Sequence, residues 1–441
     1  MSANRAGNVR MQVAPAGPLR GELLVPGDKS ISHRAVMLGA IATGRSRISG
    51  FLAGEDTLAT MRAFQQMGVR IDRREDTALE IHGVGRDGLR AAHGPLDLGN
   101  SGTSARLLSG LLAGQAFDSE IIGDASLMQR PMGRVVDPLR LMGAELSCTA
   151  AGTLPLKIRG GARLHGVEFA LPVASAQVKS ALLLAGLYAE GDTCVMEPAP
   201  TRDHTERMLR MFGVEVRSGD GRICVNRQPL CATDIQVPAD ISSAAFFLVA
   251  ASIVPGSDLV LKGVGINPTR AAVIDILRAM GAQIEIHSSG APASEPVADL
   301  RVRYSPLTGI HIPRDLVPIA IDEFPAILVA AACADGITVL TGAAELRVKE
   351  SDRIAAMAAG LHALGITAEP AADGMSVTGG VFRRGTVDSA GDHRIAMAFA
   401  VAGCRASGQV QITDCANVNT SFPGFAGCLR AVGGNISEQQ V

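Results

Sequence analysis

The stretch VPGDKSISHR, residues 25–34, sets charged and hydroxyl side chains directly before a strongly apolar run. One interpretation is a capped helix with Ser30 as the N-cap residue and Asp28 beside it. The other is an anion site, because helix N–H groups, the cations of Lys29 and Arg34 and a hydroxyl would converge on one point. This stretch alone leaves both interpretations open.

A second charged run, AELRVKESDR, has a similar character. It would ordinarily be the solvated face of a helix. Lys349 and Arg353 are four residues apart, however, so a helix would bring two like charges onto one face at a small cost. An anion bound between them would remove that cost, which favours a binding role.

Six internal repeats supply the elements that must position these groups. Each repeat holds a helical stretch that ends in an apolar residue and Gly, followed by a short β-like run. The marker glycines are Gly68, Gly143, Gly213, Gly281, Gly365 and Gly433. Gly directly after a helix supplies the left-handed conformation of a C-cap, so each repeat is predicted to contain an amphipathic helix and then a strand.

A more apolar helix precedes each marker, as in AVMLGAIATG, RLLSGLLAG, ALLLAGLYAEG, AAFFLVAASIVPG, AILVAAACADG and IAMAFAVAG. A helix that is apolar on every face must be buried. Four of the six begin beside Lys or Arg, which opposes the helix dipole unless an anion lies between. The sequence therefore predicts an α/β fold of two lobes with three repeats each, helices inside and sheets outside. The N-termini of the buried helices are expected to hold an anionic ligand in a cleft between the lobes.

Composition narrows the class of protein. The 441 residues carry a net charge of -2, so a nucleic-acid partner is not expected. Eight Cys without a CxxC pair predict reduced thiols and no metal site. The N-terminus lacks the apolar region of a signal peptide, and no run reaches transmembrane length without polar residues. We expect a cytoplasmic protein without a membrane partner.

The chain resembles a known family, the 5-enolpyruvylshikimate-3-phosphate synthases. The resemblance runs almost end to end and rests on LLVPGDKSISHRA, LGNSGTSARLLSG, GDASLMQRPMGRV, ASAQVKSALLLAG, TRDHTERML, IDEFPAI, AELRVKESDRIAAM, DHRIAMAFA and TSFPGF. It implies a two-lobed, inside-out α/β barrel of six βαβαββ repeats, which agrees with the repeat count above. We place lobe 1 at residues 1–26 plus 246–441 and lobe 2 at residues 27–245, with closure of the lobes on the substrates.

The resemblance also implies an activity. Members of the family transfer the enolpyruvyl group of phosphoenolpyruvate to the 5-hydroxyl of shikimate 3-phosphate and release phosphate. This step belongs to the shikimate pathway, which leads to chorismate and the aromatic amino acids. It requires no metal and no organic cofactor. We expect the chain to act on these two small molecules as a monomer.

Matching motifs carry the family's site residues onto this chain. Shikimate-3-phosphate binding falls to Lys29, Ser30, Arg34, Ser175, Ala176, Gln177, Thr201, Arg202, Asp322 and Lys349. Phosphoenolpyruvate binding falls to Lys29, Asn100, Gly102, Arg130, Gln177, Arg353 and Arg394. The catalytic roles fall to Lys29, Asp322 and Glu350: Lys29 contacts both substrates, Asp322 is a base near the 5-hydroxyl, and Glu350 shuttles the methylene proton. Ala176 can offer only its backbone N–H. Neighbouring His33 and Arg106 are expected to be structural.

Two departures from the family pattern stand out. Many relatives carry a lysine just before the run TFP or SFP, where this chain has Asn419 and Thr420. We assign no residue there. Leu107 stands where some relatives have a proline after the loop arginine. Glyphosate occupies the phosphoenolpyruvate site in sensitive relatives. Gly102 favours inhibition here, whereas Ser101 and Leu107 leave that expectation open.

Two other functions could use the same scaffold. The related transferase that acts on UDP-N-acetylglucosamine usually has a cysteine in a mobile loop, but the equivalent stretch GDASLMQRPMGRV has none. A non-catalytic anion-binding protein on the same scaffold would not need Asp322 and Glu350, which are both present. The shikimate activity is therefore the function that the sequence predicts.

Overall fold

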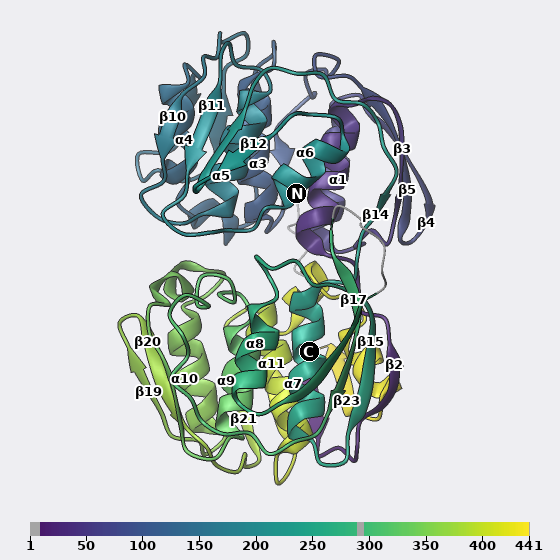
Figure 1. Cartoon of the computed structure of the whole chain (residues 1–441), viewed down its shortest axis with the longest axis vertical. Coiled ribbons are helices and arrows are strands. Elements are labelled where there is room, and N and C mark those ends of the chain that lie inside the picture. The colour runs from purple at the N-terminus through teal and green to yellow at the C-terminus, as the bar shows by residue number, and fades with distance from the viewer. Residues whose placement is uncertain (1–8, 289–294, 441) are drawn as a thin grey trace. The chain divides into compact units, whose positions relative to one another are not determined.

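The computed structural model describes residues 9–288 and 295–440 and divides into two compact units. Unit 1 comprises Met1–Pro26 and Pro238–Val441, and unit 2 comprises Gly27–Val237. Residues 1–8 lie outside the described residues. Two predictions include them: the absence of a signal peptide and the assignment of residues 1–26 to lobe 1. Within each unit, long helices stand in the middle and sheets cover them on the outside (Figure 1).

Among the described residues, six helices are buried over most of their length, as the apolar repeats predict. They are α1 (Lys29–Ile41), α3 (Gly102–Ala113), α5 (Ala176–Gly186), α7 (Ile241–Ile253), α9 (Phe324–Ala332) and α11 (His393–Arg405). All thirteen residues of α7 are buried. Most of its side chains are Ala, Ile, Leu, Val or Phe and none is charged, so the helix has no charged face to turn toward solvent and must lie in the core.

Six further helices alternate with these within residues 9–288 and 295–440. They are α2 (Glu55–Gln66), α4 (Gly133–Leu141), α6 (His204–Met211), α8 (Ala272–Ala279), α10 (Arg353–Ala363) and α12 (Phe425–Ala431). Each ends just before one of the six marker glycines, whose φ angles all lie between 81° and 105°. The predicted left-handed C-caps are confirmed. Short 3₁₀ turns add η1 (Leu127–Gln129), η2 (Ala344–Val348) and η3 (Ala416–Thr420).

Three four-stranded sheets enclose the helices of unit 2 in the part of the chain that the structure describes. In spatial order they are β14 (Ile235–Gln236), β3 (Thr43–Ser49), β5 (Ala78–Val84) and β4 (Arg70–Glu75); β6 (Leu96–Asp97), β7 (Ser119–Ile122), β9 (Leu156–Ile158) and β8 (Leu146–Ser147); and β10 (Glu168–Ala170), β11 (Thr193–Met196), β13 (Arg222–Val225) and β12 (Arg217–Gly219). The first pair in each sheet is parallel and the others are antiparallel. Since β14 pairs with β3, the end of the unit returns to its beginning.

Unit 1 repeats this plan among its described residues. Its sheets are β2 (Arg20–Leu23), β15 (Asp258–Gly265), β17 (Val297–Arg303) and β16 (Gln283–Ser288); β21 (Gly385–Asp388), β22 (Val410–Thr413), β1 (Val9–Ala14) and β23 (Asn435–Gln440); and β18 (Ile337–Leu340), β20 (Gly374–Thr378) and β19 (Ala368–Ala371). The third sheet has isolated parallel bridges, such as His311 to Val339, in place of a fourth strand. The predicted α/β fold with six repeats, three per unit, is confirmed.

The N-terminal segment belongs to unit 1 because its two strands complete sheets there. Strand β1 pairs with both β22 and β23, and β2 pairs with β15. The boundary expected between residues 245 and 246 needs correction, because it falls inside α7. The contacts divide the chain at Pro238, just before Asp240, whose carboxylate caps that helix. An apolar helix that packs as one piece cannot be shared between two cores.

The prediction of reduced thiols is wrong for two of the eight cysteines. Cys194 and Cys224 form a disulfide across β11 and β13. They stand directly opposite each other in the antiparallel register, with Cα atoms 4.1 Å apart. Register between two strands cannot be deduced from Cys spacing, so the sequence gives no signal for this bond.

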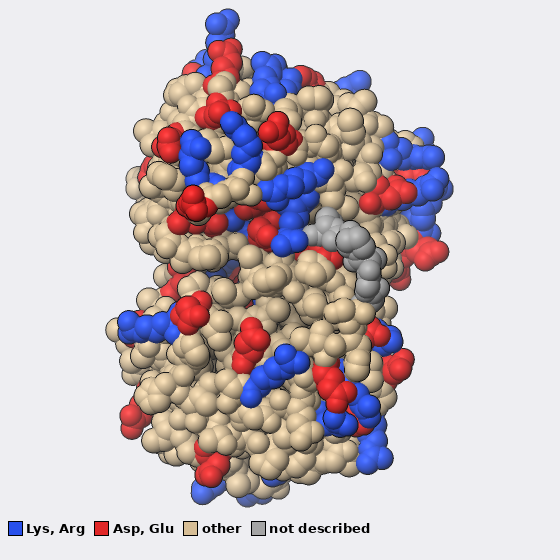
Figure 2. All heavy atoms as spheres, viewed as in Figure 1, with Lys and Arg blue, Asp and Glu red and all other residues tan. Residues whose placement is uncertain are grey.

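Charged side chains of both signs are interspersed on the face shown in Figure 2. Over β3, β4 and β5, arginines alternate with acidic residues, and several of them form ion pairs. None of the helices in the described ranges is both long enough and apolar enough to span a bilayer.

Candidate active site

In unit 2, Lys29 opens helix α1 and faces the first turn of α2. Its ammonium forms an ion pair with the largely buried carboxylate of Asp56. Asp28, rather than Ser30, is the N-cap residue: its carboxylate accepts a hydrogen bond of 2.9 Å from the N–H of Ile31. The side chain of Ser30 is thus not used for capping and stays half-buried at the start of the helix.

Arg34 lies one turn further along α1 and joins that helix to two others. Its guanidinium donates to Thr205 Oγ1 at 2.7 Å, to Ser180 Oγ at 2.8 Å and to the carbonyl of Ser30 at 2.9 Å. Because Ser180 belongs to α5 and Thr205 to α6, this one side chain fixes the start of α1 against both. A buried cation that donates in three directions holds its neighbours at defined positions.

The start of α3 forms the next part of the site. Ser101 is its N-cap residue, and Gly102 is its first residue. A Cβ atom at Gly102 would lie 2.9 Å from Nη1 of Arg106 and 3.1 Å from Nη1 of Arg130. Glycine thus allows two guanidinium groups to approach the helix N-terminus. Asn100 accepts a short hydrogen bond from Arg130, which ties the turn to that arginine.

Gln177 connects the start of α3 to the start of α5. Its carbonyl oxygen accepts from Arg106 Nη1 at 2.7 Å, and its amide nitrogen donates to Thr103 Oγ1 at 3.0 Å. Ser175 caps α5 and Ala176 is the first residue of that helix. The predicted residues of these two motifs therefore lie together, and Arg106, expected to be structural, lies among them.

Thr201 and Arg202 lie in the sequence between Glu197 and Glu206, two acids of a buried ion cluster. Thr201 donates a short hydrogen bond to the carboxylate of Glu197. Lys179, only 1% exposed, lies 3.0 Å from Glu197 and 2.6 Å from Glu206. Burial raises the pKa of the Glu197 carboxyl, while Lys179 and Thr201 oppose that rise. Buried charges are costly unless they are paired, so this cluster holds the Thr201 segment in one place.

In unit 1, Asp322 lies between two cations. One of its carboxylate oxygens is 3.3 Å from Lys349 Nζ and 3.4 Å from Arg353 Nη1. Its backbone carbonyl accepts from Arg394 Nη1 at 2.8 Å. Glu350 lies 2.6 Å from Arg353 Nη2. The structure thus brings together all five residues that the sequence predicts for this unit.

Arg353 is the centre of this cluster and is 1% exposed. Its guanidinium contacts Asp392 through Nε at 2.8 Å and also reaches Glu350 and Asp322. Burial opposes its charge, but the carboxylates of Asp392, Glu350 and Asp322 raise its pKa. Burial likewise opposes the charge of Asp392, but Arg353 holds the pKa of that carboxyl below its usual range.

Three acids that position the cations were missed at the sequence level. Asp56 pairs with Lys29, Asp392 pairs with Arg353, and Glu323 lies 3.6 Å from Arg394. Each stands in the first turn of a helix or just before one, where acids are common for local reasons. Only the tertiary structure shows which cation each one faces.

The run without the family's lysine lies at the C-terminal end of η3. Thr420 Oγ1 donates to the carbonyl of Asn417 at 2.7 Å, so its hydroxyl supports the turn itself. Asn419 is exposed. We assign no ligand contact to either residue.

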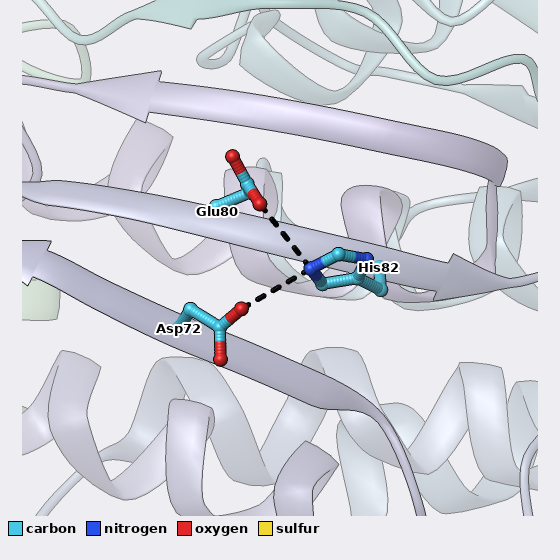
Figure 3. Close-up of side chains that lie close together, drawn as sticks. All are labelled: Asp72, Glu80 and His82. Atoms are coloured by element: carbon cyan, nitrogen blue, oxygen red, sulfur yellow. Dashed lines mark hydrogen bonds and ion pairs between the residues drawn. The ribbon is translucent and has the colours of Figure 1, made fainter.

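One further cluster has the composition of a metal site, although the sequence predicts none. His82 Nε2 lies 3.2 Å from Asp72 and 3.3 Å from Glu80 on the surface of β4 and β5 (Figure 3). Each carboxylate is also paired with an arginine, Asp72 with Arg70 at 2.9 Å and Glu80 with Arg74 at 3.1 Å. These arginines already pair with both carboxylates, so the group is a network of ion pairs and we assign no metal to it.

Comparisons with known proteins bear on the identity of the chain. A family model described as EPSP synthase (3-phosphoshikimate 1-carboxyvinyltransferase) matches residues 13–429. A 3-phosphoshikimate 1-carboxyvinyltransferase from Methylococcus capsulatus is 62% identical over 430 residues, which is 97% of this chain and 98% of that protein.

Solved structures agree. EPSP synthase from Acinetobacter baumannii superposes with a TM-score of 0.89 at 52% identity, covering 98% of this chain and 100% of that one. The enolpyruvyl transferase NikO from Streptomyces tendae has a TM-score of 0.79 at 16% identity, covering 99% of this chain and 100% of that one, and shows the shared fold alone. The chain belongs to the EPSP synthase family.

Proposed function

We propose that the clustered residues of the two units act on one pair of substrates. As a member of its family, the chain transfers the enolpyruvyl group of phosphoenolpyruvate to the 5-hydroxyl of shikimate 3-phosphate and releases phosphate. Each substrate carries a phosphate and a carboxylate. A site for both therefore needs several cations whose other contacts hold them in place.

The observation that supports this proposal most directly is the grouping of cations at the N-termini of the buried helices in unit 2. Arg34 joins α1 to α5, and Arg106 joins α3 to α5, so three helix N-termini lie together with cations among them. Helix N–H groups and guanidinium groups both favour bound anions. In the proposal, shikimate 3-phosphate is bound here by Lys29, Ser30, Arg34, Ser175, Ala176, Gln177, Thr201 and Arg202.

Phosphoenolpyruvate is proposed to bind beside it. Asn100, Gly102, Arg130 and Gln177 contribute from unit 2, together with Lys29, which contacts both substrates. Arg353 and Arg394 contribute from unit 1, where Lys349 also reaches shikimate 3-phosphate. Planar guanidinium groups suit bidentate contact with carboxylate and phosphate.

The proposed mechanism is an addition followed by an elimination. Asp322 takes the proton of the 5-hydroxyl as its oxygen attacks C2 of phosphoenolpyruvate, and the methylene carbon C3 accepts a proton from Glu350 or Lys29. In the second step a proton leaves C3 to the same group, the bond between C2 and the phosphate oxygen breaks, and the double bond is restored. The departing phosphate takes up the proton held by Asp322. Positioned acids and bases typically accelerate such transfers about 10²–10⁴-fold.

Supporting geometry for these roles comes from unit 1. Asp322 lies against two cations, and Glu350 contacts Arg353, so both carboxylates are held beside groups that would bind substrate. Asp322 and Glu350 remain partly exposed, which leaves them accessible to a ligand.

The finer parts of the proposal concern assembly and location. We propose that the active site lies in the cleft between the two units, that they close on the substrates, and that the chain acts as a cytoplasmic monomer without nucleic-acid or membrane partners. Closure would lower the radius of gyration measured by X-ray scattering when both substrates are added. An unchanged radius would count against it.

The deciding experiment measures phosphate release from the purified protein. We expect release with phosphoenolpyruvate and shikimate 3-phosphate, and none when UDP-N-acetylglucosamine replaces shikimate 3-phosphate. Activity with the nucleotide sugar alone would overturn the assigned acceptor.

A further inference from the structure

Helices α1 and α2 of unit 2 face each other through two polar contacts of equal spacing. Lys29 and His33 are four residues apart on α1, and Asp56 and Thr60 are four residues apart on α2. Lys29 pairs with Asp56, and His33 Nδ1 lies 2.8 Å from Thr60 Oγ1. Residues four apart lie on one face of a helix, so the second contact lies one turn below the first.

The second contact continues into α3. Thr60 Oγ1 lies 2.6 Å from Ser104 Oγ, and Ser104 Oγ lies 2.6 Å from Ser101 Oγ. Ser104 Oγ is also 3.3 Å from His33 Nδ1. These four side chains, His33, Thr60, Ser104 and Ser101, form one connected group, which we call the His33 chain.

The His33 chain lies in the interior of the unit. Each of its four side chains is at most 1% exposed. Burial, with Lys29 and Arg34 adding to it, keeps the pKa of the His33 imidazole well below its ordinary value. The ring is therefore neutral, with one nitrogen a donor and the other an acceptor. In a low-dielectric interior such bonds are strong and directional, and an apolar replacement would fill space without fixing orientation.

We propose that His33 is a positioning residue: through the His33 chain it fixes the first turn of α1 against the turn that begins α3. One end of the His33 chain is His33 itself, one helical turn after Lys29 on α1. The other end is Ser101, the residue between Asn100 and Gly102. The inference rests on the proposed function, in which Lys29, Asn100 and Gly102 contact phosphoenolpyruvate. Neither His33 nor Thr60 touches a substrate in this scheme.

Thr60 offers the sharpest test, because the chain contains a matched control. Thr60 and Thr193 are both fully buried in unit 2, but Thr193 Oγ1 has no hydrogen-bond partner among the described residues. Both T60V and T193V replace a hydroxyl by a methyl group of similar size. We expect T60V to raise the KM for phosphoenolpyruvate about five- to tenfold, as for a lost buried hydrogen bond. T193V should stay within about twofold of the wild type, and T60S, which keeps the hydroxyl, should restore the wild-type KM.

A second pair covers the case in which T60V fails to fold. Ser104 and Ser109 are both fully buried in α3, but Ser109 bonds to the carbonyl of Ala105 in its own helix, outside the His33 chain. S104A should raise the KM for phosphoenolpyruvate and S109A should not. Because Thr60 and Ser104 both belong to the His33 chain, their effects should not add. The double variant T60V/S104A should therefore have nearly the KM for phosphoenolpyruvate of the worse single variant.

Hydrogen exchange of the ligand-free, full-length protein separates this inference from the proposed function. Amides of residues 100–104 should exchange faster in T60V and S104A than in T193V and S109A. Equal exchange in the two pairs, or faster exchange with an unchanged KM, overturns the positioning role. If the wild type releases no phosphate from the two substrates, the proposed function is refuted, and with it a positioning role for those substrates. The exchange rates would still show whether the His33 chain fixes the turn at residues 100–104.

Discussion

The carboxylate of Asp392 accepts a hydrogen bond of 2.8 Å from Arg353 Nε and another of 2.9 Å from the backbone N–H of Arg394. One buried acid thereby holds a buried guanidinium and caps the helix that carries the second arginine. Both arginines belong to the proposed phosphoenolpyruvate site. Asp392 therefore fixes the geometry of two cations that lie far apart in the sequence.

Replacing Asp392 by Asn tests this arrangement. D392N leaves the buried charge of Arg353 with less compensation, which should lower the free energy of unfolding by about 3–5 kcal/mol. Urea unfolding followed by circular dichroism measures the difference. D335N alters an exposed aspartate of the same unit and should change stability by less than about 0.5 kcal/mol. Equal stabilities of the two variants would contradict the role of Asp392.

The same carboxyl predicts how stability depends on pH. Because Arg353 lowers the pKa of Asp392 in the folded state, the pair contributes stability above the unfolded pKa of about 3.9. That contribution is lost as the pH falls below this value toward the folded pKa. Unfolding midpoints measured from pH 6 down to pH 3 should therefore fall more steeply for the wild type than for D392N. Parallel curves would exclude the pair as a source of acid sensitivity.

Glu350 is expected to act in proton transfer rather than in binding. E350Q keeps the shape of the side chain but cannot accept the methylene proton, so kcat should fall at least about 100-fold. The dissociation constant for shikimate 3-phosphate should stay near the wild-type value. E369Q, which alters an exposed glutamate of β19, serves as the control. Unchanged turnover in E350Q would remove Glu350 from the mechanism.

The variant G102A tests whether the close approach of Arg106 and Arg130 to the start of α3 matters for phosphoenolpyruvate binding. The added Cβ of G102A would lie 2.9 Å from Arg106 and 3.1 Å from Arg130. Because the atoms it meets are the far ends of flexible side chains, the protein should fold with little change in Tm. The displaced guanidinium groups should raise the KM for phosphoenolpyruvate about tenfold or more.

Glyphosate provides a second measurement on the same variant. It should compete with phosphoenolpyruvate in the wild type and bind more weakly to G102A. Equal inhibition of both proteins would show that this glycine does not shape the shared pocket.

The disulfide between Cys194 and Cys224 should stabilise unit 2. It closes a segment of 30 residues, for which the loop-entropy relation gives about 3–4 kcal/mol. The double variant C194A/C224A should therefore unfold at lower denaturant concentration than the wild type, whereas C231A, at an exposed free cysteine, should not. A wild type whose unfolding is unaffected by reductant would contradict this prediction.

Most of the fold could be predicted from the sequence because its signals are local. An apolar run such as residues 241–253 must be buried wherever it packs, and Gly68 after a helix acts as a C-cap in any fold. The boundary near residue 246 was misplaced because one continuous helix gives no sign of which core it joins. The bond between Cys194 and Cys224 was missed because it depends on strand register.

For the candidate site, the sequence predicts the substrate-facing residues but not the protein groups that hold them. Lys29, Arg130 and Arg353 could be named from motifs. Their protein partners could not, because Asp56 and Asp392 look like ordinary acids at helix N-termini. The pairing of Lys29 with Asp56 depends on how α1 packs against α2, which no short sequence window contains.

Strand β1 lies inside its sheet, between β22 and β23, although it is the first strand of the residues that the structure describes. During synthesis, all of unit 2 has been made once residue 237 has left the ribosome. Strand β1 can pair only after β22 and β23 have been made, about four hundred residues later. Nascent chains are therefore expected to fold the middle of the protein first. Trimming the chain back to residue 15 would remove an interior strand and open that sheet.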